Sequence, residues 1–179
     1  MPTVFDKLNL KEEKEIVVLN APGSFEEALG ALAGVKVVRS AAKAKEVEFA
    51  VVFVVTQAEL DAAAAALTPK AGADGKLWFA YPKQSSKKYK CEFNRDSGWN
   101  KLGDAGFEPV RMVAIDEDWS ALRFRRAEKI KTLTRSFAIS ENGKQRTAAV
   151  AKKSVAKKGA APAAKKSAAP VAKKSAAKK

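Results

Sequence analysis

The stretch FAVVFVVTQAE, residues 49–59, decides the fold of this chain. Its first seven residues are apolar without alternation, which is typical of a strand buried on both faces in a parallel sheet. Thr56 followed three residues later by Glu59 is a capping box, so a helix over 58–67 should begin directly after the strand. Pro69 and Gly72 follow as its stop signals. A buried strand that leads straight into a helix indicates an α/β domain.

The chain before this stretch repeats the strand–helix pattern. Residues 16–20, IVVLN, form a β-rich apolar run that predicts a second buried strand, and a turn follows at 21–23. Ser24 and Glu27 have the capping-box spacing and predict a helix to residue 33, with a glycine after it. A short strand is expected over residues 35–39.

The chain after this stretch adds three more strands and a helix. We expect strands at 76–81, 110–115 and 119–125, and a helix that starts near residue 94 or 96 and ends at 105. In the last strand the alternation places Leu122 and Phe124 on one face and the arginines at 123 and 125 on the other.

The order of these elements is β-α-β-β-α-β-α-β-β, which predicts a mostly parallel open sheet covered by helices on both faces. The link at 116–118 is too short for a parallel crossover, so the last two strands must be antiparallel. The sequence therefore predicts a Rossmann-like α/β domain over residues 1–136, whose sheet ends in an antiparallel hairpin.

Residues 148–179 have a different composition. They contain only Ala, Lys, Ser, Val, Pro and Gly, and ten of the 34 basic residues of the chain, which leaves 24 basic against 20 acidic residues before them. Such a segment buries too little apolar surface to offset its chain entropy, so we expect a linker over 137–147 and a disordered tail over 148–179. The ten lysines are Lys152, Lys153, Lys157, Lys158, Lys165, Lys166, Lys173, Lys174, Lys178 and Lys179.

A flexible polycation suits a polyanion with regularly spaced charges, which predicts DNA or RNA as the partner of the tail and the ten lysines as the nucleic-acid-binding residues. The first fifteen residues are polar and charged without an apolar signal core, and the apolar run 49–55 is too short to span a bilayer. We therefore expect a cytoplasmic protein without a membrane partner, associated with the nucleoid where the nucleic acid is chromosomal DNA.

Three segments carry a resemblance to a known family: VVLNAP at 17–22, WFAYPK at 78–83 and DEDWSALRF at 116–124. Together they resemble a bacterial family of small domains of unknown function, over roughly residues 5–130. That family is similar in layout to Rossmann-like methyltransferases, so the resemblance implies the fold. The tail resembles the Lys/Ala/Pro-rich C-terminal arms of linker histones and bacterial histone-like proteins, which implies DNA binding through backbone charge.

Polar residues at the expected carboxyl ends of strands form a candidate ligand rim, because ligands of open α/β sheets bind at that edge. Lys83 could hold a phosphate or carboxylate there. Capping and turn formation account for the same residue types, and the turn 20–24 has one glycine and a proline where nucleotide-binding turns have several glycines. The rim residues are Asn20, Gly23, Ser24, Thr56, Tyr81, Lys83, Asp116 and Asp118.

The sequence holds no recognisable catalytic set. It has no histidine and one cysteine, which excludes His-based triads and the usual zinc, haem and iron–sulfur ligand sets, so we expect no metal and no cofactor. The leading hypothesis is a non-enzymatic nucleic-acid-associated protein, in which the α/β domain has a second, unidentified protein or small-ligand partner. The alternative is a divergent methyltransferase-like enzyme or small-ligand sensor that the tail tethers to nucleic acid.

Overall fold

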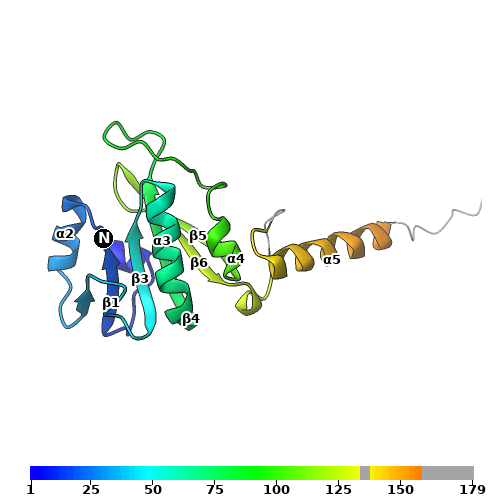
Figure 1. The fold of residues 1–179 in the computed structure, drawn as a ribbon, viewed down its shortest axis with the longest axis horizontal. Helices are drawn as coiled ribbons and strands as arrows, with labels where there is room; N and C mark the ends of the chain where they lie inside the picture. Colours follow the sequence, from blue (N-terminus) through cyan, green and yellow to red (C-terminus); the bar gives the residue numbers. More distant parts are fainter. Residues whose placement is uncertain (134–137, 159–179) are drawn as a thin grey trace, which may run out of the picture.

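The computed structural model describes residues 1–133 and 138–158, without the side chains of 151–158. Within these residues the chain forms a six-stranded sheet in the order β2-β1-β3-β4-β6-β5 (Figure 1). Strands β1 to β4 are parallel, and β6 is antiparallel to both β4 and β5. The strands are β1 (Glu15–Leu19), β2 (Lys36–Val38), β3 (Val47–Phe53), β4 (Ala71–Pro82), β5 (Phe107–Ala114) and β6 (Trp119–Arg126).

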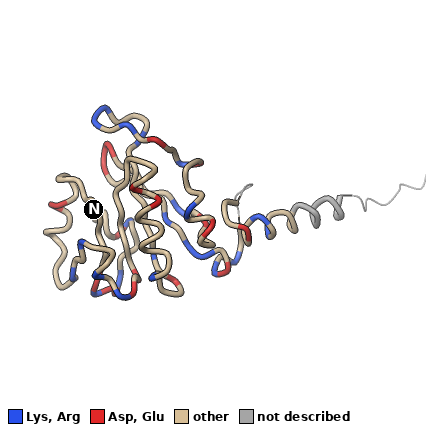
Figure 2. The backbone as a smooth tube through the Cα atoms, viewed as in Figure 1, with Lys and Arg blue, Asp and Glu red and all other residues tan. Residues whose placement is uncertain are grey.

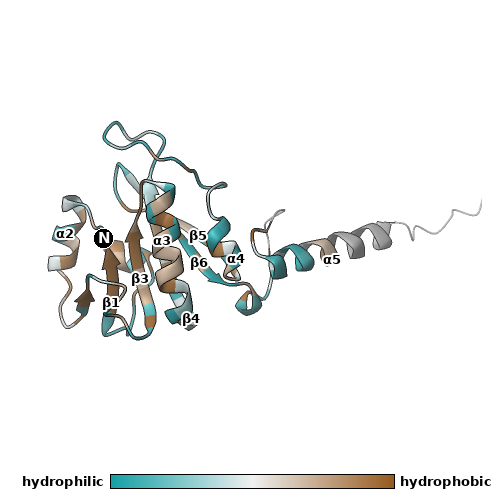
Figure 3. Ribbon diagram, in the orientation of Figure 1, coloured by the Kyte–Doolittle hydropathy of each residue, from teal (hydrophilic) through white to brown (hydrophobic). Residues whose placement is uncertain are grey.

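This topology confirms the predicted Rossmann-like sheet with its antiparallel hairpin, and it places the returning strand β6 inside the sheet with β5 at the edge. Two apolar clusters cover the faces: one packs α3 and α4, the other α1 and α2. The brown apolar strands at the centre of Figure 3 mark this core. The helices are α1 (Val4–Lys7), α2 (Gly23–Gly30), α3 (Gln57–Leu67), α4 (Asn100–Asp104) and α5 (Glu141–Lys158).

The central strand and the helix after it form as predicted. All residues of β3 except Glu48 are buried, as expected for a strand between two parallel neighbours. The Thr56 hydroxyl accepts the backbone N–H of Glu59, and the Glu59 carboxylate accepts those of Val55 at 2.8 Å and Thr56 at 3.0 Å. These backbone hydrogen bonds, Val55 first, lower the pKa of Glu59, so the capping box holds an ionised carboxylate at the positive end of α3.

The second predicted capping box is wrong. Helix α2 begins at Gly23 with Pro22 as its N-cap and without a side-chain cap, and it ends at Gly30 rather than at residue 33. Pro22 has the extended backbone that precedes a helix, φ −70° and ψ 158°, so the N-cap lies two residues before Ser24. The Ser24 hydroxyl therefore lies inside the helix and donates to Asp116.

In the C-terminal segments the structure adds packed residues and a helix to what the sequence predicts. The predicted linker at 137–147 contains packed residues, since Ser140 is fully buried and Ile139 lies against the core. Helix α5 includes 148–158, the first part of the predicted disordered tail, because Ala and Lys are strong helix formers and the helix start is capped. Residues 159–179 lie outside the described residues.

Helix α5 leaves the sheet at the β5 edge and extends away from the domain (Figure 1), and its described part is hydrophilic (Figure 3). Across 1–133 and 138–158, no helix combines the length and apolarity that a membrane crossing needs.

Candidate functional site

Asn20 is the first of the rim residues, which lie at the carboxyl ends of the parallel strands. This residue follows β1 and has a left-handed backbone with φ 55°, a conformation that Asn tolerates better than most residues. Its side-chain amide donates to the carbonyl of Phe53 at the end of β3, at 3.3 Å. β1 and β3 flank the point where the strand order reverses, which is the usual ligand position in such sheets. The Asn20 side chain therefore links the ends of β1 and β3 by a hydrogen bond within the protein.

Three further rim residues meet in one hydrogen-bond network. The Ser24 hydroxyl donates to Asp116 Oδ2 at 3.1 Å, and Lys83 Nζ donates to the Asp116 carbonyl at 2.6 Å. Asp116 Oδ1 accepts the backbone N–H groups of Asp118 and Trp119, both at 2.8 Å. This carboxylate thus closes the turn between β5 and β6 and ties it to α2, which is a structural role for all three side chains.

Asp118 is fixed in the same way by the loop after β4. Its carboxylate accepts one hydrogen bond from Ser86 Oγ at 2.8 Å and pairs with Lys88 Nζ at 3.2 Å. The Ser86 hydrogen bond, followed by Lys88, lowers the pKa of Asp118, so its carboxylate is ionised in neutral solution. The acidic turn is held against the loop by these contacts.

The remaining rim residues are spread along the same edge. Thr56 is used as the cap of α3, and the buried Tyr81 hydroxyl donates to Met112 Sδ at 3.5 Å. Gly23 faces open space, because a Cβ built there meets no atom within 4 Å. Among the rim residues, Ser24, Lys83 and Asp116 are thus joined by hydrogen bonds, whereas Gly23 has no side chain that could take part in such a network.

The end of β2 carries a cation where nucleotide-binding Rossmann folds place a ribose-binding carboxylate. Arg39 follows β2, and its guanidinium forms two hydrogen bonds of 2.7 Å with Glu26 of α2. The hydrogen bond from Arg39 lowers the pKa of Glu26. Within residues 1–133 and 138–158, the carboxylate that contacts Arg39 is therefore already paired with it, which argues against ribose recognition at this strand end.

Possible metal ligands and the single cysteine, Cys91, give no evidence of metal or thiol chemistry in the described part of the chain. No group of three or more Cys, Asp or Glu side chains within it has an arrangement that could hold a metal ion. Burial raises the pKa of the Cys91 thiol, so this cysteine is a poorer nucleophile than a free one.

Of the ten lysines predicted to bind nucleic acid, Lys152, Lys153, Lys157 and Lys158 belong to α5, where only their backbone is described. The other six lie outside the described residues. Their role stays a prediction.

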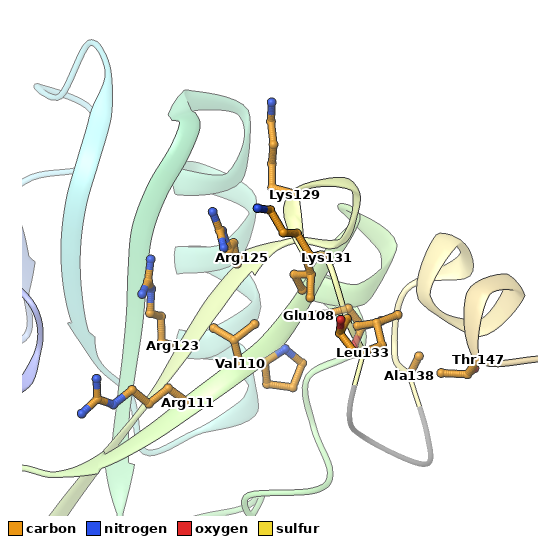
Figure 4. A pocket seen from close by; sticks show the side chains of 13 residues that line it. Glu108, Val110, Arg111, Arg123, Arg125, Lys129, Lys131, Leu133, Ala138 and Thr147 are labelled. Atoms are coloured by element: carbon orange, nitrogen blue, oxygen red, sulfur yellow. The ribbon is translucent and has the colours of Figure 1, made fainter. Parts of the chain in front are cut away.

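A basic surface that the sequence analysis did not single out lies beside the start of α5. It borders a pocket of about 540 Å³ between β5, β6 and the segment 129–133, and Thr147 of α5 lines the same pocket. Figure 4 shows its cationic side chains following one another along one side of the pocket, and Figure 2 shows the basic residues of β5 and β6 leading toward α5. We call this the basic groove, formed by Arg111, Arg123, Arg125, Lys129 and Lys131.

The sequence contained one signal for the groove. The alternation in the last strand placed the arginines at 123 and 125 on the face opposite Leu122, and the structure confirms this. The missing information was the register, which sets Arg111 of β5 directly opposite Arg123. Pairing between strands brings these cations together, and no local pattern in the sequence encodes it.

Helix α5 is anchored at the groove by a buried carboxylate. Glu108 is 2% exposed and accepts the backbone N–H groups of Ile139 at 2.9 Å and Ser140 at 2.7 Å, together with the Ser140 hydroxyl at 2.6 Å. Ser140 Oγ in turn accepts the N–H of Gly143 at 3.0 Å and so caps the helix. A carboxylate is favourable there because it faces the positive end of α5.

A second anchor comes from α5 itself. The Arg146 guanidinium donates to the carbonyls of Ala127 and Ile130, each at 2.5 Å, and to that of Lys131 at 3.1 Å. Helix α5 is therefore joined to β5 through Glu108 and to the segment 127–131 through Arg146, and the helix extends away from the domain from this point.

No protein-family model matches the chain, and no curated protein is significantly similar to it. Among solved structures, the ribosomal protein L11 methylase from Lactobacillus delbrueckii subsp. bulgaricus is 10% identical, with 69% of this chain and 76% of that chain covered and a TM-score of 0.45. The fibrillarin pre-rRNA processing protein of Methanococcus jannaschii is 14% identical, with 70% and 69% covered and a TM-score of 0.44. TrmN from Thermus thermophilus is 8% identical, with 69% and 47% covered and a TM-score of 0.45. These structural neighbours are methyltransferase-like Rossmann folds, and likenesses this weak carry no argument about the activity of this chain.

Proposed function

We propose that this protein binds nucleic acid through the phosphate backbone, without reading the base sequence, and that the lysine-rich C-terminal segment is the main binding element. The observation that supports it is the distribution of charge: ten lysines and no acidic residue follow position 147. The anchors at Glu108 and Arg146 hold the start of this segment on the α/β domain.

The mechanism is electrostatic. Each lysine that neutralises a phosphate releases condensed counterions, and this release drives binding at low salt. A lysine ammonium is a point charge on a flexible stem, so it contacts phosphates without the planar fork that reads base edges. The α/β domain would then be carried to nucleic acid as a unit, since α5 is docked on it.

The test is a salt series on two duplexes of unrelated sequence, with the full chain and a variant in which all ten tail lysines are glutamine. The affinity of the full chain should fall steeply with salt and should be the same for both duplexes. The variant should lose most of that salt dependence. Salt-independent binding, or a strong preference for one duplex, would refute the proposal.

The second candidate function is a divergent methyltransferase-like enzyme or a small-ligand sensor. The topology favours it, because the parallel strands β1 and β3 place polar residues where Rossmann-like sheets bind ligands. Fold alone does not assign an activity. The side chains at this edge, Asn20 and Ser24 among them, are engaged in contacts within the protein.

We expect the full chain to show no saturable micromolar heat when titrated with S-adenosylmethionine. Asn20 bridges the strand ends, Pro22 offers no backbone N–H at the start of α2, and Arg39 stands at the end of β2. Isothermal titration calorimetry measures this. The matched variant is Gly23→Val, whose side chain enters open space and should leave the fold intact. A saturable signal that this variant abolishes would make the second candidate the better function.

A further inference from the structure

We propose that the basic groove is a second nucleic-acid contact, which binds the phosphodiester backbone beside the point where α5 leaves the domain. This inference rests on the proposed nucleic-acid function and adds a site on the folded domain to the one in the tail.

The first argument is the charge balance of the groove. Three carboxylates lie near its five cations, and all are engaged: Asp74 Oδ1 pairs with Arg125 Nε at 2.7 Å, Glu13 pairs with Lys76, and Glu108 holds the start of α5. Arg111, Lys129 and Lys131 are exposed, and no salt bridge of theirs is found within the described residues. The groove therefore carries an excess of positive charge available to an anion.

The second argument is that the arrangement does not help the fold. Arg111 and Arg123 are direct cross-strand partners, and like charges in that position are destabilising. Arg123 is half-buried, and within the described residues its Nε has no hydrogen-bond acceptor. Burial, with a smaller contribution from Arg125 and Arg111, lowers the pKa of Arg123, so its charged form is held in an unfavourable place. An anionic oxygen bound in the groove would relieve the repulsion between the two guanidinium groups.

A second unpartnered donor lies next to it. Trp78 on β4 is the register partner of Arg123 and is fully buried, and its indole Nε1 also lacks an acceptor among the described residues. Buried donors without partners are uncommon because each one loses its hydration without compensation. Two of them on paired residues show that this part of the sheet is not optimised for stability.

The shape of the groove favours a polymer over a single phosphate. Arg123 and Arg125 are two residues apart on β6, which separates them by roughly 6–7 Å along the strand. Their row continues through Lys129 and Lys131 to the segment where Arg146 ties α5 down (Figure 4). A row of separate cations that leads to the lysine-rich segment matches an extended chain of phosphates.

The first experiment compares three charge-matched triple variants of the full chain in the salt series. The groove variant is Arg111→Gln, Lys129→Gln and Lys131→Gln, and its slope of log K against log salt should be smaller by up to about 2.7 units. The tail variant, with glutamine at 165, 173 and 178, should act comparably. The control variant, with glutamine at 7, 43 and 45, removes the same charge from α1 and from the loop between β2 and β3, and its slope should stay that of the wild type.

These variants separate the two proposals. A loss of slope in the tail variant alone would overturn the groove and leave the proposed function standing. Equal losses in all three would mean that net charge, not the groove, controls binding, and would also overturn it. A wild-type chain that binds no duplex would refute both proposals.

The second experiment uses Arg123→Met, which keeps the stem that packs on the sheet and removes the charge. We expect a melting temperature equal to or above that of the wild type, because a desolvated, repelled cation is lost. Binding to the duplex should weaken by about tenfold, since a charge-assisted hydrogen bond is lost. A lower melting temperature with unchanged affinity would assign Arg123 to the fold and refute the inference.

A comparison of ligands tests whether the groove binds the phosphates of nucleic acid or those of a lipid surface. Duplex DNA and duplex RNA of one sequence should both respond to the groove variant, because the phosphodiester is common to them. Vesicles with phosphatidylserine serve as the competing polyanion. Groove-dependent binding to vesicles without groove-dependent binding to either duplex would overturn the assignment to nucleic acid.

Discussion

The tail by itself should lower the affinity for duplex DNA by about 500-fold between 50 and 200 mM salt if about five tail lysines contact phosphates at once, and contacts in the groove would add to this fall. The reason is that each contact contributes about 0.9 to the slope of log K against log salt, which gives about 4–5 units for five contacts. Replacement of all ten tail lysines by glutamine should reduce the slope by that amount. Fluorescence anisotropy on two unrelated duplexes measures both slopes.

A smaller change gives the graded control. Glutamine at Lys165 and Lys166 should reduce the slope by up to about two units, and acetylation of the same lysines should act in the same way because it removes the charge. Neither change should alter the preference between duplexes. If the ten-lysine variant kept the wild-type slope, the tail would not be the binding element.

Trp119→Ala should lower the free energy of unfolding by about 3–5 kcal/mol, a large part of the stability of a domain of this size. The ring is 3% exposed and lies edge-on to Phe53, with ring centroids 5.1 Å apart, and against Tyr89 at 5.0 Å. The truncation therefore leaves a cavity between the sheet and the loop after β4. The midpoint of urea unfolding should move to lower concentration.

Two matched variants test the cause. Trp119→Phe keeps an aromatic ring against Phe53 and should lose much less stability than the alanine variant. Val110→Ala, on the neighbouring strand β5, shortens a side chain that is 39% exposed and should change stability little. Near-wild-type stability of Trp119→Ala would contradict its place in the core and would make it a candidate for ligand contact.

Much of the fold could be predicted from local patterns. The continuous apolar run in β3 can be satisfied only by burial on both faces, and the Thr56–Glu59 capping box is complete within four residues. The short turn at 116–118 excludes a crossover, so the antiparallel hairpin followed from chain length alone. These features need no information about distant residues.

The helix starts that the sequence did not predict correctly depend on residues far away in the chain. Ser24 has the sequence of a cap, yet its hydroxyl bonds to Asp116, 92 residues away. The start of α5 lies in a segment that reads as a linker, because Glu108, which holds it, belongs to a strand 32 residues earlier. Local spacing cannot anticipate an acceptor that only the folded chain brings near.

The same distinction divides the candidate sites. The sequence by itself determined the sheet, its antiparallel hairpin and the concentration of charge after residue 147, because period, turn length and composition are local quantities. Only the tertiary structure decided that Asn20 bridges β1 and β3, and that Arg111 meets Arg123 beside the anchored helix. Both depend on strand order and register, which are set by the packing of the whole sheet against its helices.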